Sequence, residues 1–397
     1  MSERLARLGL ALLVALLAAC QPVPPGPPPA HLTQAEWWAS PARGWEPPAS
    51  LAEAGDGVLA AGTPWQPVAL PHARPREVAR ADGGQAPPEV AWYRLHVPAA
   101  PLAATPQGPR LYLPRWQTIG TLAVYVDGRL AWRSRGSRTW NSFNRPVWID
   151  LAGLAAPGQP LTVHVRMASQ PGVGGALSSL WAGSAEALTP GWRARSLLQA
   201  DLVAFSRGSY LLLGVCALAL WLPRRRQRGE AVFLLFFLMS LCHLLATLQY
   251  LVDTEGFGLA DDWFSWLTLA GSLGSALCAF HVLCLVQRRA RPRTGRVLAA
   301  YVGAVALLTL PLWSLPHAGM LPLLRLTLLP PSLVVLAVAL GGAWRQRDWA
   351  SGLLAGWMAL SIPVGLHDLA LQSYRLSIEH IYLTPYLYLG LFTMFLW

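Results

Sequence analysis

Ionisable side chains inside apolar stretches are the residues of this sequence best suited to chemistry. Arg325, His367 and Asp368 lie in long apolar runs, as do His243 and His281. A charged group inside a bilayer is costly and is usually paired or functional. Arg325 and Asp368 are predicted at similar depth, so we expect an ion pair that a proton on His367 could bias as a switch. An ion pair that only fixes helix packing is the alternative.

The histidines are not predicted to form a metal site. His243 is predicted near the middle of the membrane, whereas His281 is predicted toward the cytoplasmic side and His367 toward the periplasmic side. Because one metal ion needs its ligands at one depth, we expect each histidine to pack or to form hydrogen bonds. No metal and no cofactor are predicted.

A second group of polar and aromatic residues lies in the N-terminal half. Aromatic faces and planar hydrogen-bonding groups suit sugars or carboxylates. The candidate ligand-binding residues are Arg115, Trp116, Arg135, Trp140, Asn141 and Arg145. The alternative is that the tryptophans are core residues and the arginines are solvated or bridge two domains. No Ser/His/Asp or paired-carboxylate arrangement can be assigned, so no hydrolase and no catalytic residue are predicted.

Long apolar segments must position the first group of residues. Crossing a bilayer takes about 20 mainly apolar residues, and a helix satisfies its own backbone there. Residues 202–397 contain seven such segments, at 202–222, 231–252, 263–287, 297–315, 320–344, 349–370 and 381–397. We therefore predict a seven-helix transmembrane domain over residues 202–397.

The charges of the connecting loops predict the orientation of these helices. Arginines follow the first, third and fifth segments, whereas acidic or nearly neutral loops follow the second and fourth. Arginine-rich loops stay in the cytoplasm. We therefore expect a multi-pass protein of the inner membrane with its N-terminal half in the periplasm and Trp397 in the cytoplasm. Much of the net charge of +11 lies in these loops. We interpret it as a determinant of orientation and of contact with anionic membrane lipids, and not as a sign of nucleic-acid binding.

The first 35 residues indicate export. Residues 1–20 have a basic start, an apolar run and the ending Leu17-Ala18-Ala19-Cys20, which is typical of a signal peptide with lipidation at Cys20. An ordinary signal peptide or an uncleaved anchor remains the alternative. Residues 21–35 are rich in proline and are predicted to be an extended spacer.

Residues 36–190 change to short alternating runs, which is the pattern of strands. The expected strands are 92–97, 110–113, 121–126, 130–133, 147–151 and 161–167. Asp127-Gly128 between two of them favours a tight hairpin. We predict a periplasmic β-sandwich over residues 36–190, joined to the membrane domain by a linker or short helix at 191–201. No cysteine lies in the sandwich, so it is expected to fold without disulfides.

This organisation resembles the bacterial seven-transmembrane receptors with diverse intracellular signalling modules. The resemblance rests on Ala91-Trp92-Tyr93-Arg94, on Val124–Gly128, on Trp132–Pro146, on His367-Asp368 and on Ile381–Tyr386. It implies a jelly-roll, galactose-binding-like sandwich before seven helices, most like the sensor part of a receptor histidine kinase. A signalling module would follow Trp397 in that family.

Three functions remain open from the sequence. The first is a receptor that senses a periplasmic small molecule or carbohydrate and signals to a cytoplasmic histidine kinase-type or cyclase-type module or response-regulator pathway. The second is a membrane-anchored carbohydrate-binding or scaffold protein. The third is a transporter, although no inverted repeat is visible. The oligomeric state, including a homodimer, is not determined by these patterns.

Overall fold

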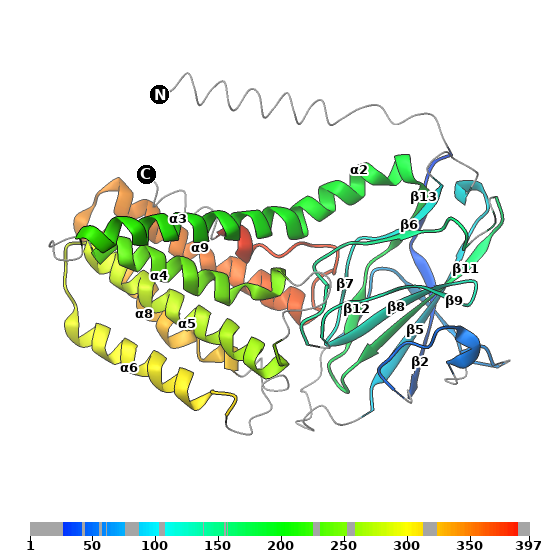
Figure 1. Ribbon diagram of the computed structural model, residues 1–397, viewed down its shortest axis with the longest axis horizontal. Coiled ribbons are helices and arrows are strands. Elements are labelled where there is room, and N and C mark those ends of the chain that lie inside the picture. Colours follow the sequence, from blue (N-terminus) through cyan, green and yellow to red (C-terminus); the bar gives the residue numbers. More distant parts are fainter. Residues whose placement is uncertain are drawn as a thin grey trace, which may run out of the picture.

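The computed structural model shows a β-sheet domain followed by a helical region (Figure 1), which confirms the predicted order of the two parts. It describes residues 27–41, 44–54, 58–60, 62–75, 87–102, 108–137, 139–154, 156, 158–224, 231–251, 259–312 and 324–387. The predicted signal peptide with Cys20 and the end of the chain at Trp397 lie outside the described residues.

The described strands form three antiparallel sheets. The six-stranded sheet has the order β3 (Gln66–Ala69), β2 (Gln34–Pro41), β5 (Glu89–Val97), β11 (Leu161–Ser169), β8 (Gly120–Val126) and β9 (Arg129–Arg133). The four-stranded sheet has the order β1 (Ala30–Leu32), β13 (Leu180–Ser184), β6 (Pro109–Leu113) and β10 (Val147–Asp150). The three-stranded sheet has the order β4 (His72–Arg74), β12 (Gly175–Leu177) and β7 (Trp116–Gln117).

Each of the six predicted strands corresponds to an observed strand. The sheet domain begins earlier than the predicted residue 36, because β1 begins at Ala30 and β2 at Gln34. The last residues of the predicted spacer are therefore part of the sheet domain, paired with β13 and β3. The Asp127-Gly128 hairpin is also present: both residues have positive φ, of 45° and 84°, and Val126 pairs with Arg129. Positive φ at both central residues is what a type I′ turn requires.

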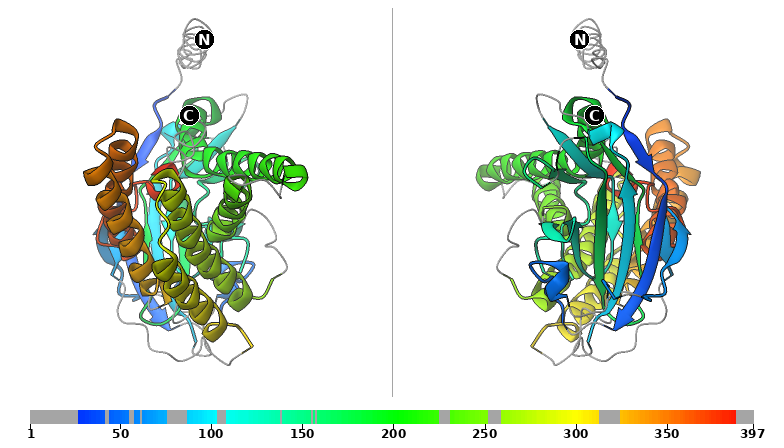
Figure 2. Two further views of the ribbon diagram at one scale, coloured as in Figure 1. Left: turned by 90° about the vertical axis from the view of Figure 1, so that its left-hand side faces the viewer. Right: turned by 90° about the vertical axis from the view of Figure 1, so that its right-hand side faces the viewer.

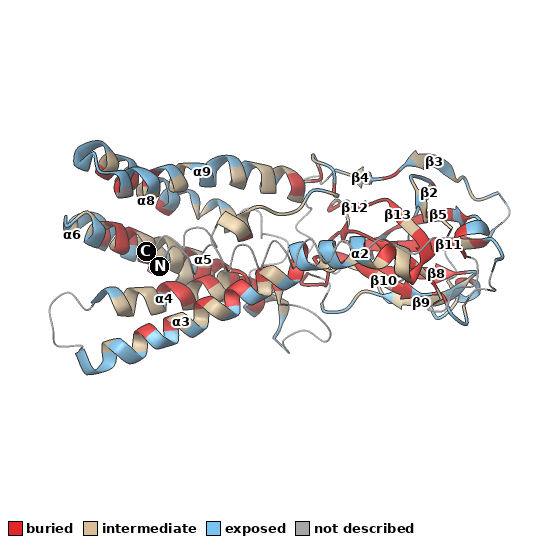
Figure 3. Ribbon diagram, turned by 90° about the horizontal axis from the view of Figure 1, so that it is seen from above, coloured by how far each residue is buried: buried red, intermediate tan, exposed pale blue. Residues whose placement is uncertain are grey.

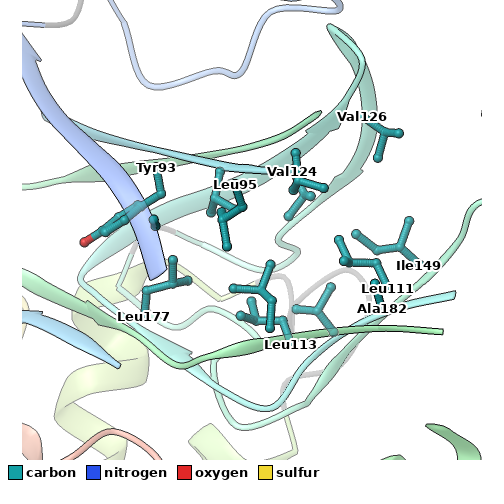
Figure 4. Close-up of a cluster of buried hydrophobic side chains, with 14 of the residues drawn as sticks. Tyr93, Leu95, Leu111, Leu113, Val124, Val126, Ile149, Leu177 and Ala182 are labelled. Atoms are coloured by element: carbon teal, nitrogen blue, oxygen red, sulfur yellow. The ribbon is translucent and has the colours of Figure 1, made fainter. Parts of the chain in front are cut away.

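The main core lies between the six-stranded and four-stranded sheets (Figure 4). Alternate residues of β5 and β8 point into it, among them Tyr93, Leu95 and Val124, and they meet Leu111 and Ile149 from the opposite sheet. Such alternation follows from the two-residue period of a strand. The other face of the six-stranded sheet is covered as well, because Leu51 and Val58 bury Trp92 and Tyr125 from outside.

One helical rod of 40 residues joins the sheet domain to the helical region. It consists of α2 (Ala185–Ser196), a π-helical turn (Leu197–Asp201) and α3 (Leu202–Arg224) (Figure 1). Ser184 caps its start by accepting a hydrogen bond from the Ala187 N–H at 3.2 Å. The predicted linker at 191–201 is therefore continuous helix.

The remaining helices are α4 (Ala231–Ala246), α5 (Asp261–Val286), α6 (Pro292–Leu308), α8 (Leu329–Gln346) and α9 (Trp349–Gln372). Four described helices are long and apolar enough to cross a membrane: Ala185–Arg224, Asp261–Val286, Leu324–Gln346 and Ser351–Gln372. Helix α4 is apolar but shorter. The described residues thus support a membrane-spanning helical region, and a bundle of seven spans remains a proposal.

The outer sides of these helices are exposed to a large extent, whereas the centre of the sheet domain is buried (Figure 3). Many of the exposed residues of the helices are large and apolar. Phe205, Leu308 and Trp344 are 73%, 71% and 79% exposed. A soluble protein rarely exposes apolar patches of this extent, so the surface is suited to lipid. The end views in Figure 2 show the helices gathered at one end of the molecule and the sheets at the other.

Candidate functional site

Residues 373–387, called here the junction segment, follow α9 and lie between the helices and the sheet domain (orange to red in Figure 1). Tyr374 and Ile378 of this segment are buried, and they pack with Ala176 of β12. A piece of chain from the helical half therefore contributes to the packing of the sheet domain.

Glu379 ties the junction segment to α2 and to Ser179, the residue before β13. Its Oε1 accepts hydrogen bonds from the N–H and the hydroxyl of Ser179, at 3.1 and 2.5 Å. Its backbone carbonyl accepts a hydrogen bond from Nη2 of Arg195 at 2.5 Å. Because Arg195 lies near the end of α2, three parts of the chain meet at one residue.

Arg115 forms the centre of the next set of contacts, although it is only 1% exposed. Its Nη1 donates to the carbonyl of His380 at 2.5 Å. The guanidinium carbon lies 4.4 Å from the ring centroid of Tyr382, a distance that allows a cation–π interaction. Both amide atoms of Gln117 are within hydrogen-bond distance of the Tyr382 hydroxyl, at 2.7 and 3.0 Å.

Asp368, at the end of α9, holds the start of a helical turn that follows at residues 384–387. Its two carboxylate oxygens accept hydrogen bonds from the N–H groups of Leu383 and Thr384, at 2.9 and 2.8 Å. N–H groups at the start of a helix lack intrahelical partners, and a negative charge is favourable there. The side chain of Asp368 thus fixes the fold of the junction segment.

The structure brings His367 and Asp368 together but arranges Arg325 differently from the expected ion pair. Nδ1 of His367 lies 2.9 Å from Oδ1 of Asp368. Arg325 donates to Oε1 of Gln372 at 2.8 Å, about one helical turn beyond Asp368. In the described part of the chain, the carboxylate of Asp368 is engaged by His367 and by backbone N–H groups.

Trp140 and Arg145 also bridge the two parts. Nε1 of Trp140 donates to the hydroxyl of Ser265 at 3.1 Å, and its ring lies 4.7 Å from the ring of Phe264. Both partners belong to α5. Nη1 of Arg145 lies 3.6 Å from Oδ1 of Asp201 in the helical rod.

The six candidate ligand-binding residues therefore occupy different environments. Arg115, Trp140 and Arg145 bridge the domains, and Trp116 is fully buried in the core. Asn141 is buried and donates to the carbonyls of Thr118 and Gly120, at 3.1 and 2.9 Å. Arg135 is exposed. This arrangement favours the domain-bridging alternative for Arg115 and Arg145 and the core alternative for Trp116. Trp140 is buried as well, but in contact with α5, and ligand binding at Arg135 stays a prediction.

The sequence did not single out Arg207 as a functional residue. Arg207 of α3 is fully buried, and its Nη1 contacts Nε2 of His243 in α4. The ring of His243 also lies 5.4 Å from that of Tyr210. An arginine that interrupts an apolar segment was the available signal, because such a group needs a polar partner on a neighbouring helix.

An open groove of about 340 Å³ lies beside the contacts of Glu379. Tyr112 of β6 and Trp181 of β13 line it from the sheet domain, Arg195 from α2, and Glu379 from the junction segment. The ring of His31 stacks on Trp181 at 3.8 Å. Burial raises the pKa of Tyr112 to about 12, so its phenol stays protonated near neutral pH and can donate a hydrogen bond.

Comparison with known proteins identifies no family. No family model and no curated protein matches the chain. Among solved structures, a β-glucuronidase from Ruminococcus gnavus is 16% identical, with a TM-score of 0.25, and the match covers 39% of this chain and 28% of the enzyme. A β-glucuronidase from Faecalibacterium prausnitzii is 19% identical, with a TM-score of 0.23, over 35% of this chain and 21% of the enzyme. The chain spans less than a third of either enzyme.

Proposed function

We propose that the chain is a membrane receptor in which ligand binding to the sheet domain changes the arrangement of the helices. The observation that carries this proposal is the lining of the 340 Å³ groove, which comes from β6, β13, α2 and the junction segment together. A ligand shifts a conformational equilibrium only when it binds the two states differently. A ligand that contacts all these elements at once can meet that condition.

The proposed ligand is a small carbohydrate or carboxylate. The groove has the size of a typical small-molecule site. The guanidinium of Arg195 suits a carboxylate, whereas the ring of Trp181 offers an apolar face with a polar edge. The hydroxyls of Tyr112 and Ser179 add groups that can orient a polar ligand.

The membrane arrangement is proposed on the basis of loop charge and family resemblance. The sheet domain, taken as a jelly-roll sandwich, would face the periplasm, and seven spans would end in the cytoplasm. A histidine kinase-type or cyclase-type output would receive the signal there. In this proposal two segments couple the sheet domain to the helices. They are the continuous rod 185–224 and the junction segment that follows α9.

The proposal is tested on the full chain in lipid nanodiscs. Monosaccharides and small carboxylates are screened by thermal shift, and hydrogen exchange is then measured with the compound that binds. We expect altered protection in residues 368–387 as well as in β6 and β13. Trp181→Ala should abolish binding, whereas Trp344→Ala, which changes an exposed tryptophan of α8, should not.

The other two functions give different results in the same experiment. A carbohydrate-binding scaffold would confine the change in protection to the sheet domain. A transporter would carry the compound into sealed vesicles. Either outcome would refute signalling through the junction segment.

A further inference from the structure

A group of arginines lies at the end of the helices that is remote from the sheet domain (left in Figure 1). Some of them lie in the turn between α5 and α6 and at the start of α6, and the others lie beside the turn between α8 and α9. All of them are exposed except Arg291, which is half-buried. Together they are called here the arginine patch: Arg288, Arg289, Arg291, Arg293, Arg296, Arg345 and Arg347.

Gln287, the last residue before the first of these turns, holds the two turns together. Its carbonyl accepts a hydrogen bond from Nε2 of Gln346 at 3.2 Å, and its Oε1 accepts one from Nη2 of Arg291 at 3.3 Å. Its Nε2 donates to the carbonyl of Val338 at 2.9 Å. A Cβ on Gly342 would lie 2.0 Å from this Nε2, so the glycine leaves room for the amide. The two groups of arginines therefore belong to one surface.

The positive charge of the arginine patch is not balanced by neighbouring carboxylates. Asp348 is the one acidic residue of the stretches 288–296 and 345–348. Its carboxylate caps the start of α9, where it accepts hydrogen bonds from the N–H and the hydroxyl of Ser351, at 2.7 and 2.8 Å. Among the described residues, no ion pair joins an arginine of the patch to a carboxylate. Because like charges repel, an anionic occupant would relieve this arrangement.

The residues beside the arginine patch favour a lipid as the occupant. Val297, Trp344 and Trp349 are 71%, 67% and 79% exposed in the order Val297, Trp349 and Trp344. Tryptophan beside arginine at the end of an apolar helix is typical of the membrane interface. A phospholipid offers phosphate oxygens to the forked donors of the guanidinium groups and acyl chains to the apolar side chains. An acidic protein segment offers only the charge.

We propose that the arginine patch binds one anionic phospholipid that carries two phosphate groups, of the diphosphatidylglycerol class. One phosphate is bound by the arginines between α5 and α6, and the other by the arginines between α8 and α9. A single lipid can bind both groups because the two turns meet at Gln287. Basic sites between membrane-spanning helices are suited to such head groups. This site requires neither the groove of the sheet domain nor a signalling role.

Simpler phospholipids match the arginine patch less well and serve as probes. Phosphatidylglycerol has one phosphate and one negative charge, so a single molecule engages the arginines of one turn and leaves those of the other. Phosphatidylcholine has a phosphate and acyl chains but no net charge, because its ammonium group balances the phosphate. The comparison of the three lipids therefore separates the second phosphate from the net charge and from the acyl chains.

The test uses the full chain in a neutral detergent at constant ionic strength. Diphosphatidylglycerol, phosphatidylglycerol and phosphatidylcholine are titrated separately, and the bound lipids are counted by native mass spectrometry. We expect one tightly bound diphosphatidylglycerol, with a Kd at least about tenfold below that of phosphatidylglycerol, because the arginines of the second turn add to its affinity. Phosphatidylcholine should not be retained. Equal affinity for the two anionic lipids at equal total charge, or no retained diphosphatidylglycerol, overturns the proposal.

Variants test the contribution of each turn. Arg289→Gln and Arg345→Gln, one from each side of the patch, should each weaken the binding of diphosphatidylglycerol roughly fivefold. Arg224→Gln is the matched control, because it removes an exposed arginine at the end of α3, which lies apart from α6 and α8 (Figure 3). It should bind the lipid like the unmodified protein. An equal loss in Arg224→Gln would show a diffuse attraction to charge and would contradict a site at the patch.

Two further measurements complete the test. The melting temperatures of the variants in phosphatidylcholine nanodiscs should equal that of the unmodified protein, because the replaced side chains are exposed. Poly-glutamate is then titrated in place of the lipid, and we expect it to bind more weakly than diphosphatidylglycerol. Binding of poly-glutamate as tight as that of the lipid would identify a docking surface for an acidic protein and would overturn the proposed lipid.

Discussion

Asp368→Ala is expected to release the junction segment and to lower the free energy of unfolding by about 3 kcal/mol or more. The carboxylate accepts two backbone hydrogen bonds, from Leu383 and Thr384, and contacts His367. A hydrogen bond to a charged group contributes roughly 1.5–3 kcal/mol. Removal also leaves two N–H groups at the start of a helical turn without partners.

Thermal denaturation and limited proteolysis of the full chain in detergent measure this effect. We expect a lower melting temperature together with new cleavage within residues 373–387. Asp201→Ala is the matched control, since Asp201 is exposed and lies 3.6 Å from Arg145, and a surface pair is worth only about 0–1 kcal/mol. If both variants melt alike, Asp368 does not hold the segment.

Acidification is expected to destabilise the sheet domain through His164. This residue of β11 is 6% exposed, and burial, followed by the positive charges of Arg94 and His96, lowers its pKa from 6.5 to about 4. As the pH falls below 6.5, His164 therefore becomes protonated in the unfolded chain, whereas it stays neutral in the folded protein until the pH approaches 4. The stability is complete above pH 6.5 and is lost toward pH 4, by about 3 kcal/mol.

The measurement is the melting temperature of the full chain between pH 7 and pH 4. His164→Asn should show a flatter dependence on pH, even if its stability at neutral pH is lower. His31→Asn, at an exposed histidine of β1, should follow the unmodified protein closely. An unchanged slope in His164→Asn would show that other groups cause the acid loss.

Strands with strict alternation were predictable from the sequence, and the others were not. The run 121–126 was predicted as a strand, and the structure buries both of its faces: Leu122 and Val124 lie in the main core, and Tyr125 lies on the opposite face under Leu51 and Val58. The alternation is absent from Gln66–Ala69 and from Gly175–Leu177, which are short and contain proline or glycine. Strand β1 follows a proline-rich stretch, and its pairing with β13 connects residues about 150 positions apart. Such long-range pairing leaves no local pattern.

The residue types of the site were visible in the sequence, but their partners were not. Arg115, Trp140 and Arg145 were recognised as able to bind a ligand, yet what they contact is the helical half and the junction segment. His367-Asp368 was recognised as a charged pair in an apolar run. Its role in capping residues 383–384 depends on how the chain folds back after α9. Periodicity indicates which face is buried and says nothing about which distant segment covers it.

The attachment of the helices to the sheet domain is tested most directly by a double-mutant cycle between Gln117 and Tyr382. These side chains are 265 positions apart, and the amide of Gln117 contacts the phenol hydroxyl of Tyr382 at 2.7 and 3.0 Å. Gln117→Ala, Tyr382→Phe and the double variant are compared by their free energies of unfolding. We predict a coupling energy of about 0.5–1.5 kcal/mol, the usual contribution of a hydrogen bond. Losses that add within roughly 0.3 kcal/mol would show that the junction segment does not bind the sheet domain at this point.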